Sequence, residues 1–560
     1  MKNDMQFYRL ISDGLLIIAD ISEKNNPFFE IFLNFFIFFS LTGICTGVML
    51  KATDHNREVC TMKRVCSLLI CIIMLATLCA CGQDIGIIGG ADGPTAVFVS
   101  GQPTPETTPP TAPPATEAPV VLSTPALPEV SGEQDPFNRT WSEMQNADFW
   151  LALCEDPQAI RMTAEEIAAY NASLSSTNGT KVEKLSAWPS VISHMELCDL
   201  LDTYGEAPAP SYYTPESRIT ADQQLEMSLN RNESAVTNEN PVRYGFLTEN
   251  LIMRTFPSDI PLYDSPEAWE YDKAAETALK LWEPVLVLHT SADGEWLLVQ
   301  AYDYLGWVET EKVALCDRDY WQTLCDAMKT DYLTVLAPRV AMDGSFYAPG
   351  QETVILKMGT VLPLAVGETE ADNATADNCH IVLLPRRSGD GTLETYTARI
   401  PKTEDVIEGC LPFTTENLLR QVFKLLGHRY GWGGTAEGWD CSSICQDAYR
   451  TVGLFLPRNS GNQRQIPGWR NVENSDLNTK YDILTGFLPG AMLELRGHQT
   501  MYIGTFEGEA YVIHATHGVY NQKGDFYNAN SVIVSSVEAF RSNGKSLMEN
   551  FRGFSMPIAK

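Results

Sequence analysis

Residues 430–443 read Tyr-Gly-Trp-Gly-Gly-Thr-Ala-Glu-Gly-Trp-Asp-Cys-Ser-Ser. The glycines predict a loop, and the residues after Cys441 have the pattern of a helix that ends near Gly453. Cys441 is therefore expected at the beginning of a helix, where unpaired N–H groups and the helix dipole favour an anion. We expect this position to lower the pKa of the Cys441 thiol from about 8.5 toward neutrality. A single cysteine is more often an inert core residue, so the nucleophile interpretation depends on the motifs around it.

Three spaced motifs surround this cysteine: Tyr430-x-Trp-Gly-Gly, Asp440-Cys441-Ser442 and Leu456-Pro457-Arg458-x-Ser460. Together they resemble the signature of the NlpC/P60 family of bacterial cysteine peptidases. The resemblance implies an α+β, papain-like catalytic domain that hydrolyses peptides of the bacterial cell wall. It also implies that Cys441 is the nucleophile and that no cofactor or metal is needed.

The histidines that a cysteine nucleophile requires follow from the same resemblance. Residues 489–493 and 497–504 look like the paired strands of the family, with His498, the predicted general base, opening the second. The third polar residue of the family matches His514, which would hold the His498 ring in the tautomer that accepts the thiol proton. His517 is the alternative, although His517-Gly518 is typical of a turn. The remaining histidines are interpreted as surface or core residues: His194, His289, His380 and His428.

A zinc site is the alternative chemistry for this region. Cys445 lies one helical turn after Cys441, and two histidines are predicted nearby. However, a C-x3-C pair on one helix is not a usual zinc spacing. The sequence therefore favours a thiol mechanism without a metal.

The substrate contacts are also implied by the resemblance. Family members with this architecture cleave between D-γ-glutamate and the following diamino acid of peptidoglycan stem peptides, and they favour a free L-Ala amine. The matching positions here are Tyr430, Asp440, Ser442, Ser460, Tyr304 and Glu276. Tyr430 would contribute to the oxyanion environment, and the others would bind the amine. Glu283 and Glu270 are alternatives to Glu276. For Tyr304 and Glu276, the alternative interpretation is that they lie on an ordinary solvated surface and bind no substrate.

The sequence before the catalytic domain has a helical pattern first and then two β-rich regions. The expected domains are a helical stabilising domain at 135–235, two SH3-like β-barrels at 236–325 and 326–405, and the NlpC/P60 domain at 406–560. In the helical domain, Thr163 and Glu166 match a capping box, and we expect Trp141, Phe149 and Trp150 to pack its core. The SH3-like regions are predicted from short β-rich runs separated by turn residues. In the first region these runs are residues 285–289, 296–302 and 306–308, with a turn at 292–294 between the first two.

The N-terminal residues predict an export signal. Residues 62–81 combine a short basic segment with an apolar stretch and end in a lipobox-like sequence, so Cys81 is the expected lipid anchor to the cell membrane. A transmembrane helix is the alternative, but the apolar stretch is shorter than the roughly 20 residues needed. Residues 1–61 are interpreted as an upstream extension from an early start codon, and 82–134 as a Pro/Thr-rich linker. Within that linker, residues 85–99 resemble part of a decarboxylase sodium pump, and we assign them no function.

The composition limits the partners. A chain of 560 residues with 40 basic and 71 acidic residues has a net charge of −31, which disfavours nucleic acid. The expected location is extracytoplasmic, and the expected partners are peptidoglycan-derived peptides. The remaining alternatives are an inactive wall-binding SH3 lipoprotein, an endopeptidase acting on intact peptidoglycan, and a transferase that uses the same acyl-enzyme.

Overall fold

The computed structural model describes residues 11–12, 15–16, 128–342, 353–367, 370–371, 374–375 and 378–558. The predicted signal peptide, Cys81 and all but the last seven residues of the predicted linker lie outside these ranges. The chain divides into two units, residues 1–120 and 121–560. In the first unit, β1 (Ile11–Ser12) pairs with β2 (Leu15–Leu16). No helix among the described residues is long and apolar enough to cross a membrane.

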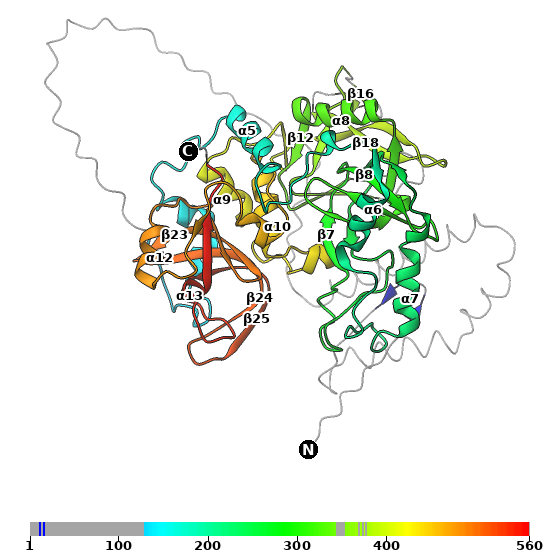
Figure 1. The fold of residues 1–560 in the computed structure, drawn as a ribbon. Coiled ribbons are helices and arrows are strands. Elements are labelled where there is room, and N and C mark those ends of the chain that lie inside the picture. The colour runs from blue at the N-terminus through cyan, green and yellow to red at the C-terminus, as the bar shows by residue number, and fades with distance from the viewer. Residues whose placement is uncertain are drawn as a thin grey trace, which may run out of the picture. The chain divides into compact units, whose positions relative to one another are not determined.

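The C-terminal part of the second unit is a six-stranded sheet with helices (Figure 1). The strand order is β21 (Arg470–Asn471), β26 (Phe551–Ser555), β22 (Met492–Leu495), β23 (His498–Phe506), β24 (Glu509–Tyr520) and β25 (Phe526–Ser536). The helices are α9 (Thr415–Phe423), α10 (Cys441–Arg450), α11 (Ser460–Gln463), α12 (Leu477–Leu484) and α13 (Leu547–Asn550). The apolar residues of α10 (Ile444, Cys445 and Ala448) are fully buried in the core that the sheet shares with α9. This arrangement confirms the predicted α+β class.

A seven-stranded antiparallel sheet precedes the catalytic part. Its order is β11 (Val313–Cys316), β5 (Arg243–Leu247), β8 (Pro284–Thr290), β9 (Trp296–Gln300), β10 (Leu305–Glu309), β6 (Leu251–Arg254) and β7 (Ala275–Leu279). The predicted runs 285–289, 296–302 and 306–308 fall on β8, β9 and β10, and the predicted turn joins the first two. The strand β7 lies against residues 432–437, in the loop before Cys441.

The next region contains shorter sheets. A three-stranded sheet is formed by β15 (Val361–Pro363), β12 (Tyr332–Val335) and β20 (Val406–Glu408). Paired strands are β13 (Arg339–Met342) with β14 (Val354–Lys357), β16 (Glu370–Ala371) with β17 (Ala374–Thr375), and β18 (Cys379–Arg387) with β19 (Leu393–Pro401). The helix α8 (Arg318–Thr330), capped by Asp317, spans the predicted boundary at 325/326 and was not expected. A second SH3 domain here stays a prediction.

The helical region contains short elements: η1 (Ser142–Gln145), α4 (Ala147–Leu151), α5 (Ala164–Leu174), η2 (Leu185–Ala187), β3 (Val191–Ser193), α6 (His194–Leu201), η3 (Asp202–Tyr204), α7 (Ala221–Asn230), η4 (Glu233–Ala235) and β4 (Glu239–Pro241). The predicted capping box at Thr163 and Glu166 is present. The region differs from the prediction in its packing, because its buried side chains do not form one core of their own.

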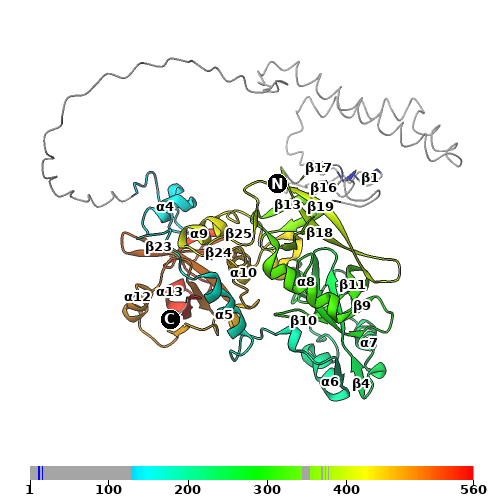
Figure 2. The same ribbon diagram turned by 90° about the horizontal axis from the view of Figure 1, so that it is seen from above.

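Two large aromatic residues explain this difference. Phe149 lies 5.3 Å from Phe506, and Trp150 lies 5.1 Å from Tyr511, measured between ring centroids. Trp141, which is partly buried, contacts the same Phe506 ring at 6.2 Å. These aromatic rings therefore complete the core of the six-stranded sheet, and Figure 2 shows α4 beside α9, which it contacts. In contrast, the buried residues from Leu185 to Leu201 belong to the core around the seven-stranded sheet.

Candidate functional site

Cys441 is the first residue of α10, as the preceding glycines predicted. The helix begins with a capping box in which the Ser443 N–H donates to the Asp440 carboxylate at 2.9 Å, and the Asp440 N–H donates to Ser443 Oγ at 2.9 Å. This box fixes the direction in which the Cys441 side chain leaves the helix. Cys441 as a residue is only partly buried.

The expected lowering of the thiol pKa is wrong. Burial raises the pKa of the Cys441 thiol to about 12, and the nearby Asp440 carboxylate acts in the same direction. The backbone N–H of Gln499, which donates to the sulfur, and the Arg458 charge offset only part of this effect. The thiol at the helix start is therefore neutral at physiological pH. The Gln499 contact also shows that the sulfur lies at the beginning of β23, next to His498.

A chain of hydrogen bonds extends from His498 across the sheet. His498 Nε2 lies 2.8 Å from His514 Nδ1, and His514 Nε2 lies 3.0 Å from Ser535 Oγ. Ser535 Oγ in turn lies 3.5 Å from Asn138 Oδ1. The two histidines are almost completely buried, and they lie on the neighbouring strands β23 and β24.

The last two groups of this chain determine the histidine tautomers. The Asn138 amide oxygen can only accept, so the Ser535 hydroxyl donates to it and accepts from His514 Nε2. His514 Nδ1 is then an acceptor for the N–H of His498 Nε2. This leaves the lone pair of His498 on Nδ1, where it can take a proton from the thiol. Burial lowers the pKa of His514 to about 3 and that of His498 well below its usual value, so both rings are neutral.

His517, the alternative to His514, lies elsewhere. Its ring stacks on Phe526 at 5.5 Å, and its Nδ1 lies 3.9 Å from Glu270. Of the other histidines, His289 Nε2 is 3.0 Å from a backbone oxygen, and His380 Nδ1 is 2.9 Å from Glu408. The structure therefore brings His514, and not His517, together with His498.

Arg458 organises the residues around Cys441. Its guanidinium donates to both oxygens of Asp440, and its NH1 group donates to Ser442 Oγ at 2.8 Å. Its Nε donates to Thr277 Oγ1 on β7 at 2.7 Å. Burial alone would raise the pKa of Asp440, but the Arg458 charge and the hydrogen bonds from Arg458 and Ser443 together outweigh it, and the net shift is downward. Arg458 is part of the motif Leu456-Pro457-Arg458-x-Ser460, but the motif alone does not indicate these contacts.

Asp440 therefore differs from its expected role as the carboxylate that binds an amine, because Arg458 already neutralises it. Glu276 is better placed for that role. Its carboxylate accepts a hydrogen bond from the Tyr304 hydroxyl, which also accepts from Asn459 Nδ2 at 3.0 Å. Burial raises the pKa of Glu276, and the hydrogen bond from Tyr304 and the charges of Arg458 and Lys181 offset only part of this effect. Glu276 forms no ion pair within the described part of the chain.

The two alternatives to Glu276 have other partners. Glu283 forms a buried ion pair with Arg450, at 2.9 Å, on α10. Glu270 accepts from Asn530 Nδ2 at 3.2 Å. Both carboxylates therefore lie outside the cluster of Glu276, Tyr304 and Asn459.

The glycines of the loop allow β7 to approach the site. Gly433 and Gly434 have positive φ angles of 59° and 86°. A Cβ atom on Gly434 would lie 2.5 Å from Ala278 Cβ, and one on Gly433 would lie 3.1 Å from the Ala275 oxygen. Larger residues would therefore push β7, which carries Glu276, away from Cys441.

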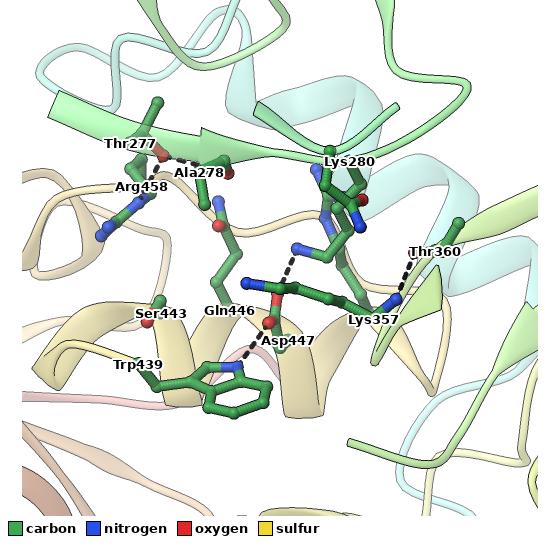
Figure 3. A network of polar contacts seen from close by, with 12 residues as sticks. Thr277, Ala278, Lys280, Lys357, Thr360, Trp439, Ser443, Gln446, Asp447 and Arg458 are labelled. Atoms are coloured by element: carbon green, nitrogen blue, oxygen red, sulfur yellow. Dashed lines mark hydrogen bonds and ion pairs between the residues drawn. The ribbon is translucent and has the colours of Figure 1, made fainter. Parts of the chain in front are cut away.

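The other face of α10 is joined to the seven-stranded sheet by buried polar contacts (Figure 3). Lys280 Nζ lies 2.6 Å from Asp447 Oδ1, and Trp439 Nε1 donates to the other oxygen at 2.8 Å. Gln446 Nε2 donates to Asp303 at 2.6 Å. An ion pair and hydrogen bonds therefore fix the position of α10 against the region of the seven-stranded sheet.

The remaining predicted residues are placed as follows. Ser460 is the first residue of α11 and is partly buried. Tyr430 lies close enough to Cys441 and Asp440 for their charges, together with burial, to raise its pKa. Cys445, which the zinc alternative requires, is fully buried in the core. Among the described residues, no group of three or more His, Cys, Asp or Glu side chains could hold a metal ion.

Comparison with known proteins agrees with this geometry. Residues 427–536 match the model of the NlpC/P60 family, and residues 261–309 match that of an SH3 domain of the SH3b1 type. A gamma-D-glutamyl-L-lysine dipeptidyl-peptidase from Bacillus cereus is 24% identical over 232 residues, covering 37% of this chain and 64% of the relative's length. This chain thus spans less than two thirds of that relative.

A solved structure has the same fold. The NlpC/P60 endopeptidase from Photobacterium damselae subsp. piscicida matches with a TM-score of 0.59 and 17% identity, covering 73% of this chain and 96% of that one. The match extends well beyond the C-terminal part of the chain. The chain therefore contains a domain that matches the NlpC/P60 family at residues 427–536, preceded by a match to an SH3b1-type domain at residues 261–309.

Proposed function

We propose that this protein hydrolyses the bond between D-γ-glutamate and the following diamino acid in peptidoglycan stem peptides with a free N-terminal L-Ala. The observation that carries the proposal is the position of Glu276 and Tyr304. These residues come from the SH3 region, and they lie beside the Arg458–Asp440 pair that caps the nucleophile helix. A buried carboxylate without a cationic partner is suited to an ammonium group.

The mechanism follows from the tautomers of the histidines. As the sulfur of Cys441 attacks the amide carbon, its proton moves to His498 Nδ1, and His514 accepts the hydrogen bond from the resulting imidazolium. His498 then donates this proton to the nitrogen of the leaving diamino acid, which breaks the amide bond. A water molecule, deprotonated by His498, hydrolyses the thioester and releases the dipeptide.

The name of the Bacillus cereus relative supports the proposed bond, because that protein is a gamma-D-glutamyl-L-lysine dipeptidyl-peptidase. A dipeptidyl-peptidase must recognise the amino end of its substrate, and a carboxylate at a fixed distance from the nucleophile does this. The lipid anchor at Cys81 and the extracytoplasmic location remain proposals from the sequence.

The test uses mass spectrometry of synthetic peptides. L-Ala-γ-D-Glu-diaminopimelate should be cleaved after D-Glu by the wild-type protein, and Cys441→Ala should abolish this cleavage. The same peptide with an N-acetylated L-Ala should be cleaved much more slowly. Absence of any cleavage would support an inactive wall-binding protein, and preference for the capped peptide would support an endopeptidase of intact peptidoglycan.

A further inference from the structure

A second pocket adjoins the catalytic histidine. It is a cavity of about 410 Å³ whose lining includes Leu495, Arg496, Arg541, Lys545, Phe551 and Arg552. Leu495 is the last residue of β22 and pairs with His498, and Arg496 belongs to the turn that joins β22 to β23. The pocket therefore begins where the general base is located, and its lining contains four basic side chains.

Three basic residues of the lining have no ion pair among the residues that the structure describes: Arg496, Arg541 and Lys545. Arg541 is the partly buried one, whereas Arg496 and Lys545 are exposed. The Arg541 guanidinium makes no hydrogen bond or ion pair with any residue that the structure describes. Arg552, in contrast, pairs with Glu473 at 3.3 Å. Glu549, the other acidic residue of the lining, accepts from the Ser546 N–H in a helix cap. The pocket consequently has an excess of positive charge at Arg541.

Arg541 also lies close to the reacting groups. Its charge contributes to the lowered pKa of both His498 and His514, and the Cys441 thiolate would in turn stabilise the Arg541 cation. A guanidinium in this position opposes protonation of the histidines. An anionic group bound to Arg541 would reduce that effect, so binding of an anion and proton transfer to His498 favour one another.

The residues of the pocket and those of the proposed amine-binding cluster come from different parts of the chain. Glu276 and Tyr304 belong to the SH3 region, whereas every residue of the pocket lining comes from residues 473–552. In the proposed mechanism His498 protonates the nitrogen of the leaving residue, so that residue lies beside His498. Leu495, which lines the pocket together with Arg541, pairs with His498.

We propose that Arg541 binds a carboxylate of the leaving diamino acid, and that this protein therefore prefers diaminopimelate to lysine at that position. The inference rests on the proposed function. Diaminopimelate carries a side-chain carboxylate that lysine lacks, and a guanidinium pairs with a carboxylate through two parallel hydrogen bonds. The α-carboxylate of D-glutamate is the other possible source of the same chemistry.

The experiment compares kcat/KM for three peptides: L-Ala-γ-D-Glu-diaminopimelate, L-Ala-γ-D-Glu-L-Lys, and the diaminopimelate peptide with D-isoglutamine. The variants are Arg541→Gln, Arg541→Lys and the matched control Arg470→Gln, an exposed residue on β21. We expect Arg541→Gln to reduce kcat/KM for the diaminopimelate peptide about 10- to 100-fold. Cleavage of the lysine peptide should change little, Arg541→Lys should retain part of the preference, and Arg470→Gln should retain all of it.

Each outcome distinguishes the two proposals. If the wild-type protein cleaves none of the peptides, the proposed function is wrong. If it cleaves both diamino acid peptides, and Arg541→Gln lowers both rates equally, the carboxylate pocket is wrong while the function stands. If Arg541→Gln removes only the discrimination between D-glutamate and D-isoglutamine, the bound carboxylate belongs to the glutamyl residue and the leaving-side assignment is overturned. Circular dichroism of each variant verifies its folding.

Discussion

The Nζ atom of Lys280, the residue directly after β7, lies 2.6 Å from Oδ1 of Asp447, so the SH3 region is ion-paired with the helix that begins at Cys441. Both side chains are almost fully buried. Removing one partner of a buried pair leaves the other charge unpaired, which costs more than the pair itself contributes.

Lys280→Met is therefore expected to lower the free energy of unfolding by about 3–5 kcal/mol. Urea denaturation followed by tryptophan fluorescence measures this change. The control is Lys329→Met, which removes an exposed pair with Asp326 and should change stability by less than about 1 kcal/mol. Equal effects of the two substitutions would contradict a structural role for the buried pair.

Glu276→Gln tests the amine-binding cluster. It removes the carboxylate charge while retaining an oxygen that accepts from Tyr304. We expect KM for the free-amine peptide to rise about 10- to 100-fold, with little change for the N-acetylated peptide. Steady-state kinetics on both peptides measure the difference. Glu270→Gln, on the same segment, is the matched control and should not change the preference.

Ser535→Ala tests the hydrogen-bond chain behind the histidines. Without the Ser535 hydroxyl, His514 Nε2 has lost its acceptor and the tautomer of His498 is less well defined. We expect kcat to fall about tenfold with KM nearly unchanged, and Ser535→Thr to restore most of the rate. Ser531→Ala, on the same strand, is the control. A change confined to thermal stability would instead show that Ser535 is only structural.

The raised pKa of the Cys441 thiol, about 12, predicts how its reactivity depends on pH. Because only the thiolate is alkylated, the rate of iodoacetamide modification should rise about tenfold per pH unit from pH 6 to pH 9. Peptide mapping assigns the modified cysteine, and Cys441→Ala removes the corresponding peptide. A rate that is already constant below pH 7 would indicate a preformed thiolate and would contradict the neutral resting pair.

The lowered pKa of His514 predicts how stability depends on pH. The unfolded chain binds a proton near pH 6.5, whereas the folded chain binds it only near pH 3, so stability decreases as the pH is lowered between these values. His514 alone should account for a loss of about 2 kcal/mol between pH 7 and pH 5. Denaturation at both pH values measures the slope, which should be shallower in His514→Gln than in the wild-type protein.

The sequence predicted those features that depend on neighbouring residues. The position of Cys441 at a helix start follows from the glycines before it and the capping residues beside it. The capping box at Thr163 likewise depends only on residues within one turn of its helix. The predicted strands at 285–289 and 296–302 likewise follow from short apolar runs between turn residues.

The features that the sequence did not predict depend on contacts between distant segments. Asn138 and Ser535 are separated by 397 positions, and nothing in either segment indicates that they meet. The raised pKa of Cys441 results from burial by the folded chain, which opposes the local effect of the helix dipole. Trp150 would be buried both in a core of the helical region, as predicted, and against the six-stranded sheet, as observed. Its apolar character alone therefore could not identify Tyr511 as its neighbour.

The packing of the aromatic residues of α4 limits which other domains could replace the SH3 region during evolution. A segment that precedes the SH3 region completes the core of a domain that follows it, so the SH3 region is enclosed between two halves of one folding unit. Exchange of that region for an unrelated module would have to preserve the distance between its two ends. Expression of residues 406–560 alone would leave the surface that Phe149 and Trp150 normally cover open to aggregation.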